Sequence, residues 1–185
     1  MKIYRLTHLV TCAALLAGAG SLAHAADKDK KNKHMDAEKP VSVNYENPGD
    51  FTDMKDSFQG TTKGMEGYQE QFRRDIKQLA KGSLPDGYTL EITFTDVDMA
   101  GDFEPSRGAD AFDIRLVKAI YPPRLKFNYT VRDASGSVVK EGSENLSDLS
   151  FQTNIGINRS DTFFYEKELM RDWMRDLNLK KNANA

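Results

Sequence analysis

The segment from Arg124 to Ser143, RLKFNYTVRDASGSVVKEGS, has the clearest strand pattern in the chain. Apolar and polar residues alternate from 124 to 132, which is the period of a β-strand with one buried face. The apolar positions are Leu125, Phe127, Tyr129 and Val131. Residues 133–136, DASG, have the composition of a hairpin loop, and Val138–Ser143 is then the returning strand. The segment therefore predicts an antiparallel hairpin that buries one face.

Three segments before the hairpin are expected to be strands of the same sheet. Val41–Tyr45 and Tyr88–Phe94 alternate in the same way, and after Phe94 the alternation continues one residue late. Such a slip predicts a β-bulge at Thr95–Asp96. Phe112–Tyr121 is the third expected strand, and the two prolines that follow it should form a bend or a sheet edge, because proline cannot donate to a ladder.

Two amphipathic helices are expected beside these strands. Apolar residues recur at spacings of three and four from Gly64 to Lys81, and Gly82 is the expected C-terminal stop. The second helix should run from Asp161 or Thr162 to Asn178, with Ser160 or Asp161 as N-cap. Strands joined by short turns favour antiparallel pairing with helices on one face. The expected fold is α+β: a mainly antiparallel sheet of about five strands with both helices packed on one face.

The two ends of the chain have other patterns. Residues 1–25 combine a basic start, a short apolar run and the A-x-A sequence Ala23-His24-Ala25, as in a secretory signal peptide cleaved after Ala25. Residues 26–40 are almost entirely polar and are expected to be a disordered leader. A single domain at 41–178 and a disordered tail at 179–185 complete the expected organisation. No later stretch reaches transmembrane length, so no transmembrane segment is expected.

Loss of the signal peptide would remove most of the residue types that catalysis often uses. The single cysteine, Cys12, and two of the three histidines lie within it, which leaves His34 in the expected leader. A Ser-His-Asp triad, a thiol nucleophile and a His or Cys zinc site would then lack their residues. We therefore assign no catalytic residue and expect a protein that is not an enzyme, although a carboxylate-pair hydrolase remains open.

The charge of the chain bears on its partners. The formal net charge is −2, and removal of Lys2 and Arg5 makes it more negative by two. Broad nucleic-acid binding depends on clustered Lys and Arg. Nucleic acid is therefore not an expected partner.

Four carboxylates follow the expected strand at 88–94, in the stretch TDVDMAGDFEP from Thr95 to Pro105. They are Asp96, Asp98, Asp102 and Glu104. Oxygen ligands of this kind suit Ca²⁺ or Mg²⁺, but the spacing differs from an EF-hand: counted from Asp96, the fifth position is Ala100 and the twelfth is Arg107. The favoured interpretation is a solvated strand end, and the alternative is a divalent-cation site. No other cofactor is expected.

A second candidate site is the stretch Tyr121-Pro122-Pro123-Arg124. A proline-rich segment can bind a partner protein. Its position between two expected strands also fits a purely structural bend. Both interpretations remain open at this point.

Three stretches together resemble a known family. They are LPDGYTLEITFTDVDMAGDFEP (84–105), DIRLVKAIYPPRLKFNYTV (113–131) and FFYEKELMRDWM (163–174). They resemble exported Gram-negative bacterial proteins grouped as domain of unknown function 3016, over about residues 41–178. The resemblance implies a periplasmic single domain, and it implies no activity, cofactor or catalytic residue.

The sequence leaves three functional hypotheses. The leading one is a periplasmic, non-enzymatic domain that binds or scaffolds another component of the cell envelope. The second is a divalent-cation-binding protein or metal-assisted hydrolase that uses Asp96, Asp98, Asp102 and Glu104. The third is self-association through a sheet edge.

Overall fold

The computed structural model describes residues 40–108, 112–153 and 160–179. The expected signal peptide, nearly all of the expected leader and residues 180–185 of the expected tail lie outside this part. Leu179 is buried in the core, so the packed region extends one residue beyond the expected end of the domain. None of the helices in these ranges is long and apolar enough to cross a membrane.

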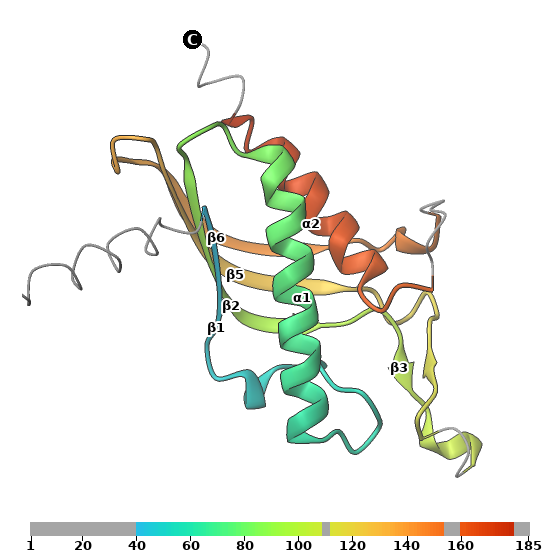
Figure 1. The fold of residues 1–185 in the computed structure, drawn as a ribbon. Coiled ribbons are helices and arrows are strands. Elements are labelled where there is room, and N and C mark those ends of the chain that lie inside the picture. Colours follow the sequence, from blue (N-terminus) through green and yellow to red (C-terminus); the bar gives the residue numbers. More distant parts are fainter. Residues whose placement is uncertain (1–39, 109–111, 154–159, 180–185) are drawn as a thin grey trace, which may run out of the picture. The chain divides into compact units, whose positions relative to one another are not determined.

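The main sheet contains four strands in the order β1-β2-β5-β6 (Figure 1). Their bounds are Val41–Tyr45 for β1, Thr89–Asp98 for β2, Arg124–Arg132 for β5 and Val138–Ser147 for β6. A small second sheet pairs β3 (Asp102–Phe103) with β4 (Arg115–Leu116). The helices α1 (Thr62–Ser83) and α2 (Phe164–Asp176) lie side by side on one face of the main sheet (Figure 1). The α+β expectation is confirmed.

The predicted hairpin is present as β5 and β6. The Asp133 carboxylate accepts hydrogen bonds from the backbone N–H groups of Ser135 (2.8 Å) and Ser137 (3.0 Å), which closes the turn. Gly136 supplies the positive φ that the loop needs. The returning strand continues to Ser147, four residues further than the sequence pattern predicted.

The pairing of β1 differs from the expectation. β1 lies parallel to β2, with Val41 opposite Leu90 and Tyr45 opposite Phe94. The chain between these strands contains α1, and a helical crossover returns the chain in the same direction, whereas a short turn reverses it. Antiparallel pairing holds for β2 with β5 and for β5 with β6.

The predicted bulge in β2 is confirmed by a register shift between Phe94 and Asp96. Beyond the bulge, Asp53 takes the place of β1 as the neighbour of β2. The backbone N–H of Asp53 donates to Val97 (2.9 Å), and that of Met99 donates to the carbonyl of Asp53 (3.1 Å). Asp53 thereby forms a parallel bridge with Asp98, which brings it to the end of β2.

Both predicted helices are present with shifted ends. Thr61 caps α1 by accepting from the N–H of Gly64 (2.9 Å). Gly82 lies inside α1, which runs to Ser83, so its assignment as the stop residue was wrong. The N-cap of α2 is Phe163; Asp161 acts just before the helix, where its carboxylate accepts from the N–H of Phe163 (3.0 Å).

The strand predicted at Phe112–Tyr121 was wrong except for Arg115–Leu116. A turn follows, in which the N–H of Tyr121 donates to the carbonyl of Lys118 (2.9 Å). The apolar residues that suggested a strand remain exposed, Ile114 by 53% and Ile120 by 71%. The segment predicted as a strand therefore buries no face of apolar residues.

The core lies between the sheet and the helices. Phe94 of β2 contacts Phe72 of α1 and Phe127 of β5, with ring centroids 5.2 and 5.4 Å apart. Trp173 of α2 packs edge-on against Phe127 and Tyr129. On the opposite face of β5, Arg124, Lys126, Asn128 and Arg132 are exposed and Thr130 is half-buried. The two helices thus fix one face of the sheet and leave the other open.

Candidate functional site

A largely buried ion pair between Asp53 and Arg115 lies where β2 ends. Nη1 and Nη2 of Arg115 lie 2.6 and 3.0 Å from the two carboxylate oxygens of Asp53. The same guanidinium donates to the carbonyls of Gly101 and Lys55, both at 3.0 Å, and stacks 4.5 Å from the ring centroid of Phe103. Arg115 therefore joins the segment before α1 to the turn after β2.

The turn after β2 depends on Gly101. This residue has a φ of 82°, and a Cβ atom there would lie 2.8 Å from the carbonyl oxygen of Leu116. A side chain would therefore meet both backbone strain and a clash with β4. Glycine at this position lets the turn approach β4 closely.

We expect Gly101→Ala to lower the free energy of unfolding by about 1 to 3 kcal/mol, because strained positive φ and the contact with Leu116 both penalise alanine. Urea unfolding followed by circular dichroism measures this. The matched control is Gly67→Ala in α1, where no atom beyond the adjacent residues and the helix's own backbone lies within 4 Å of the added Cβ. The control should gain about 0.5 to 1 kcal/mol from helix propensity. Equal effects at the two positions would contradict the assigned role of Gly101.

A hollow of about 340 Å³ opens beside the ion pair. Its lining combines residues from the end of β2, the start of β5 and the segment before α1. They are Thr52, Asp53, Lys55, Asp98, Gly101, Asp102, Ile120, Tyr121, Pro122 and Arg124. The two candidate sites of the sequence analysis therefore meet here: Asp98 and Asp102 come from one, and Tyr121, Pro122 and Arg124 from the other. Pro123 does not line the hollow.

Asp98 is the half-buried carboxylate of this hollow. Burial raises its pKa, and the Asp53 carboxylate adds to the rise, while Arg124 opposes it. Arg124 lies opposite Asp98 in the β2–β5 ladder. The hollow thus presents a carboxylate whose charge the surrounding residues neutralise only in part.

Asp96 lies on the same side of β2 as Asp98 but has a structural role. Its carboxylate accepts from the N–H (2.8 Å) and hydroxyl (3.0 Å) of Thr52 and pairs with Lys126 at 3.0 Å. Burial alone would raise the pKa of Asp96, but these hydrogen bonds outweigh it and lower the pKa. Asp96 therefore ties the segment before α1 to the sheet.

The other two carboxylates of the acidic stretch also have protein partners. Glu104 pairs with Lys118 and accepts from the hydroxyl of Tyr121 at 3.2 Å. Asp102 accepts from the N–H of Phe103 at 2.7 Å. Over the described ranges, no three His, Cys, Asp or Glu side chains converge as ligands of one metal ion. The four residues therefore do not form one cluster.

A buried carboxyl group that was not predicted from the sequence contacts the turn after β2. Glu166 of α2 is 1% exposed, and its Oε1 accepts from the N–H of Ala100 at 2.6 Å. Its Oε2 has no hydrogen-bond partner among the described residues. Burial raises the pKa of Glu166 to about 7, although the bond from Ala100 opposes the rise.

The signal for Glu166 was present in the sequence. It lies three residues after Phe163 and four before Met170, both buried, so helical spacing places it on the apolar face of α2. Asp53 and Arg115 had no such signal. Asp53 lies in an irregular segment and Arg115 in the segment that was predicted as a strand, and only the fold brings them together.

The fold and the site define the class: an α+β protein whose four-stranded sheet carries two helices on one face and a polar hollow at one end of its central strands. Within this class, the chain belongs to the family described as Protein of unknown function (DUF3016), whose model matches residues 39–176. No curated protein and no solved structure matches the chain.

Proposed function

We propose that this chain is an exported periplasmic protein that binds another component of the cell envelope at the hollow beside Asp53 and Arg115, without catalysing a reaction. The observation that carries the proposal is that Asp98, Asp102, Tyr121, Pro122 and Arg124 line one hollow. They were two separate candidate groups in the sequence. The signal-peptide pattern at residues 1–25 supports export.

The chemistry of the hollow favours a partner that offers both charge and apolar surface. Asp98 is half-buried with a raised pKa, and a positive group placed beside it would be favoured. Ile120, which lines the hollow together with Pro122, is 71% exposed. A protein segment with a basic side chain beside an apolar one meets these requirements.

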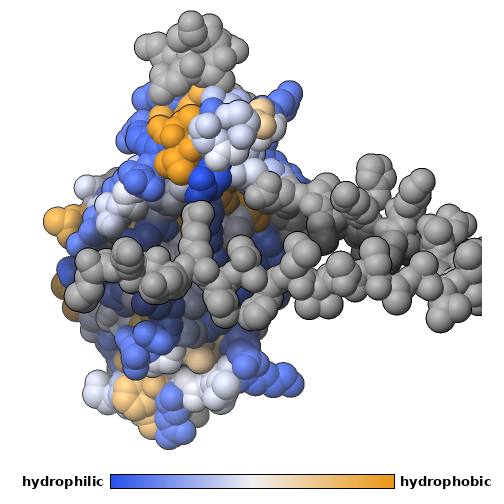
Figure 2. Space-filling view, turned by 90° about the vertical axis from the view of Figure 1, so that its left-hand side faces the viewer, coloured by the Kyte–Doolittle hydropathy of each residue, from blue (hydrophilic) through white to orange (hydrophobic). Residues whose placement is uncertain are grey.

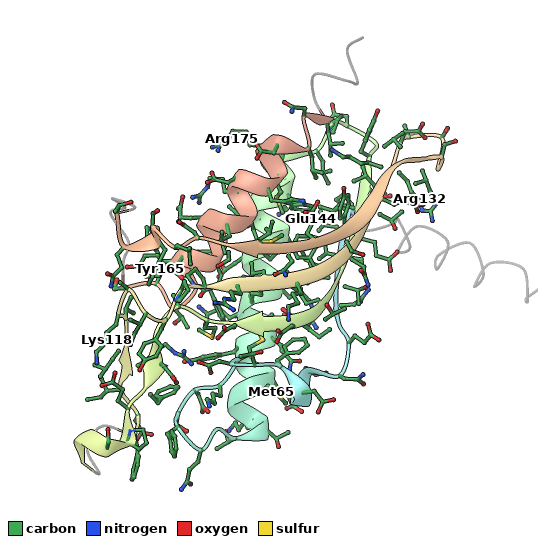
Figure 3. The ribbon with its side chains drawn as sticks, turned by 180° about the vertical axis from the view of Figure 1, so that it is seen from behind. Met65, Lys118, Arg132, Glu144, Tyr165 and Arg175 are labelled. Carbon is green, nitrogen blue, oxygen red and sulfur yellow. The ribbon has the colours of Figure 1, made fainter. Side chains whose placement is uncertain are left out.

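The proposal can be tested by photo-cross-linking in the native host. A photoreactive amino acid at Ile120 of the full-length chain should give adducts of discrete mass in the envelope fraction. The control position is Arg175 at the end of α2, which lies far from Lys118 and the β3–β4 arm (Figure 3). Adducts should be absent there. Arg124→Ala and Asp98→Asn, introduced beside the Ile120 probe, should each reduce the adducts several-fold.

Two results would overturn the proposal. One is the absence of adducts at Ile120 when the protein is produced at native abundance. The other is a set of adducts that the Arg124 and Asp98 variants leave unchanged, which would place the binding surface elsewhere.

Divalent-cation binding is the second candidate, and Asp98 is the residue that favours it. Burial is the main cause of the raised pKa of Asp98; the carboxylates of Asp53, Asp96 and Asp102 add to the rise and Arg124 opposes it, and a cation would relieve the repulsion between the carboxylates. Calorimetric titration with Ca²⁺ and Mg²⁺ tests it. A binding isotherm for one site that is lost in the Asp98→Asn variant would support a metal site. Only then would a metal-assisted hydrolase be a reasonable hypothesis for this hollow. A flat titration would leave only the partner-binding proposal.

A further inference from the structure

Among the described residues, no further strand pairs with the outer edge of β6, and the proposed function does not use this surface. β6 is the last strand of the main sheet and contributes no residue to the hollow. All of its residues are exposed except Glu144 and Leu146, which are half-buried. A strand in this position offers unpaired backbone N–H and C=O groups along its length, to which a further strand can bond.

We propose that two copies of this chain pair antiparallel through their β6 strands, with Gly142 on the two-fold axis. The pairing would join the two four-stranded sheets into one continuous sheet. In this interface the β6 edge of one chain pairs with the β6 edge of the second. The assembly is therefore a closed dimer to which no third chain can add.

The charges on β6 select this register. In an antiparallel pair, directly opposite residues point to the same face of the sheet. With Gly142 on the axis, Lys140 lies opposite Glu144 of the second copy, and the symmetry forms this pair twice. Both residues point to the helix-bearing face, because they lie opposite the buried Val131 and Phe127 of β5. Opposite charges in such cross-strand pairs stabilise a sheet.

Neighbouring registers are less favourable. An axis at Lys140, Glu141 or Glu144 places that residue opposite its own copy, which brings two like charges together. An axis at Ser143 places Lys140 opposite Leu146 and leaves no charge pair. Of the registers centred between Lys140 and Glu144, only the one at Gly142 forms ion pairs without a like-charge contact.

The surroundings of Gly142 also fit the axis. A Cβ atom on Gly142 would lie 3.2 Å from the ring of Tyr129, so this ring lies directly over the glycine. It would cover the centre of the interface on the helix-bearing face. Glu144 lies on β6 in the view of Figure 3, in the part of the strand beside this centre.

Two exposed valines would gain a contact. Val138 and Val139 are 44% and 45% exposed at the start of β6. Figure 2 views the side from which the β5–β6 hairpin projects and shows apolar surface there. Because β6 has a register shift against β5 at Val139, the two valines would lie near Asn145 and Leu146 of the second copy without strict one-to-one pairing. Part of the apolar surface at the hairpin would then be buried.

Charge reversal provides the first test. Light scattering of the purified protein should give the mass of two chains. Lys140→Glu and Glu144→Lys should each give one chain, because each places like charges opposite one another. The double variant Lys140→Glu/Glu144→Lys restores opposite charges and should again give two chains. Arg175→Glu, at an exposed site on α2, is the control that should change nothing.

Cysteine cross-linking tests the register itself. Glu141 and Ser143 of the second copy would lie directly opposite, at a Cα separation of about 5 Å, which a disulfide can span. A mixture of Glu141→Cys and Ser143→Cys chains, both carrying Cys12→Ser, should therefore cross-link under mild oxidation. Each variant alone should not, because equal positions lie diagonally at about 7 to 8 Å.

The outcomes decide the proposal clearly. A single-chain mass at every concentration would overturn it, including the case in which β6 then binds an extended segment of a different protein. A two-chain mass that neither single reversal changes would also overturn it, because another surface would then form the dimer. Neither result depends on the hollow, so the proposed function can fail or hold independently.

Discussion

Replacement of Asp53 by alanine is expected to lower the free energy of unfolding by about 3 to 5 kcal/mol, since it leaves the buried guanidinium of Arg115 without its counter-charge. The Asp53 side chain is 8% exposed and that of Arg115 is 16% exposed, so water cannot replace the lost partner fully. The measurement is urea unfolding at neutral pH, monitored by circular dichroism. This loss would be a large part of the stability of a typical domain.

A matched control separates burial from charge. Arg175 and Asp172 form an ion pair at 2.9 Å on the exposed side of α2. Asp172→Ala should change the free energy of unfolding by less than about 1 kcal/mol. A double-mutant cycle completes the test: Asp53→Ala with Arg115→Met should cost less than the sum of the single variants by at least about 1 kcal/mol. Additive losses would mean that the two residues act separately.

The second large effect concerns Glu166 and the pH. Its pKa is raised from 4.5 to about 7 by burial, so the folded protein holds this proton more tightly than the unfolded chain. The stability from the protonated carboxyl group is complete below about pH 4.5 and is lost as the pH rises through 7. A shift of this size corresponds to about 3 kcal/mol. Arg115 lowers this pKa and Asp161 raises it.

Comparison with Glu166→Gln isolates this contribution. Glutamine keeps an oxygen that can accept from the N–H of Ala100 but does not titrate. The stability of the wild-type protein relative to this variant should fall by about 3 kcal/mol between pH 4.5 and pH 8. Asp172→Asn, on the exposed side of the same helix, is the control. A difference between wild type and Glu166→Gln that stays constant with pH would show that the buried carboxyl group does not titrate in this range.

Features with a local cause were predictable from the sequence. The β5–β6 hairpin follows from alternation and a DASG turn, and the bulge in β2 follows from a one-residue slip. Phe112–Tyr121 shows the limit of this reasoning. A segment with apolar residues forms a strand only where a core surface exists to bury one of its faces, and the local sequence does not report whether that surface is present.

The site was predictable in part for a related reason. Asp96 and Asp98 point to the same side of β2, but they meet different cations: Lys126 lies opposite Asp96 and Arg124 lies opposite Asp98. Asp96 and Asp98 are close in sequence, but because they face different residues of β5 they have different roles. Asp53 and Arg115 were united by the same fold although they are distant in sequence. Proximity of this kind depends on strand pairing, which local patterns do not encode.

The parallel pairing of β1 with β2 has a consequence for the order of folding. Val41 meets Leu90 only after the chain that contains α1 has been enclosed in a loop, whereas β5 and β6 meet across a short turn. Loop closure costs more entropy as the loop grows, and contacts between distant residues slow folding. The hairpin can therefore assemble first, and β1 would join the sheet late. The two edge strands of the sheet therefore differ in the time at which they form: β6 pairs early, within the hairpin, and β1 pairs last.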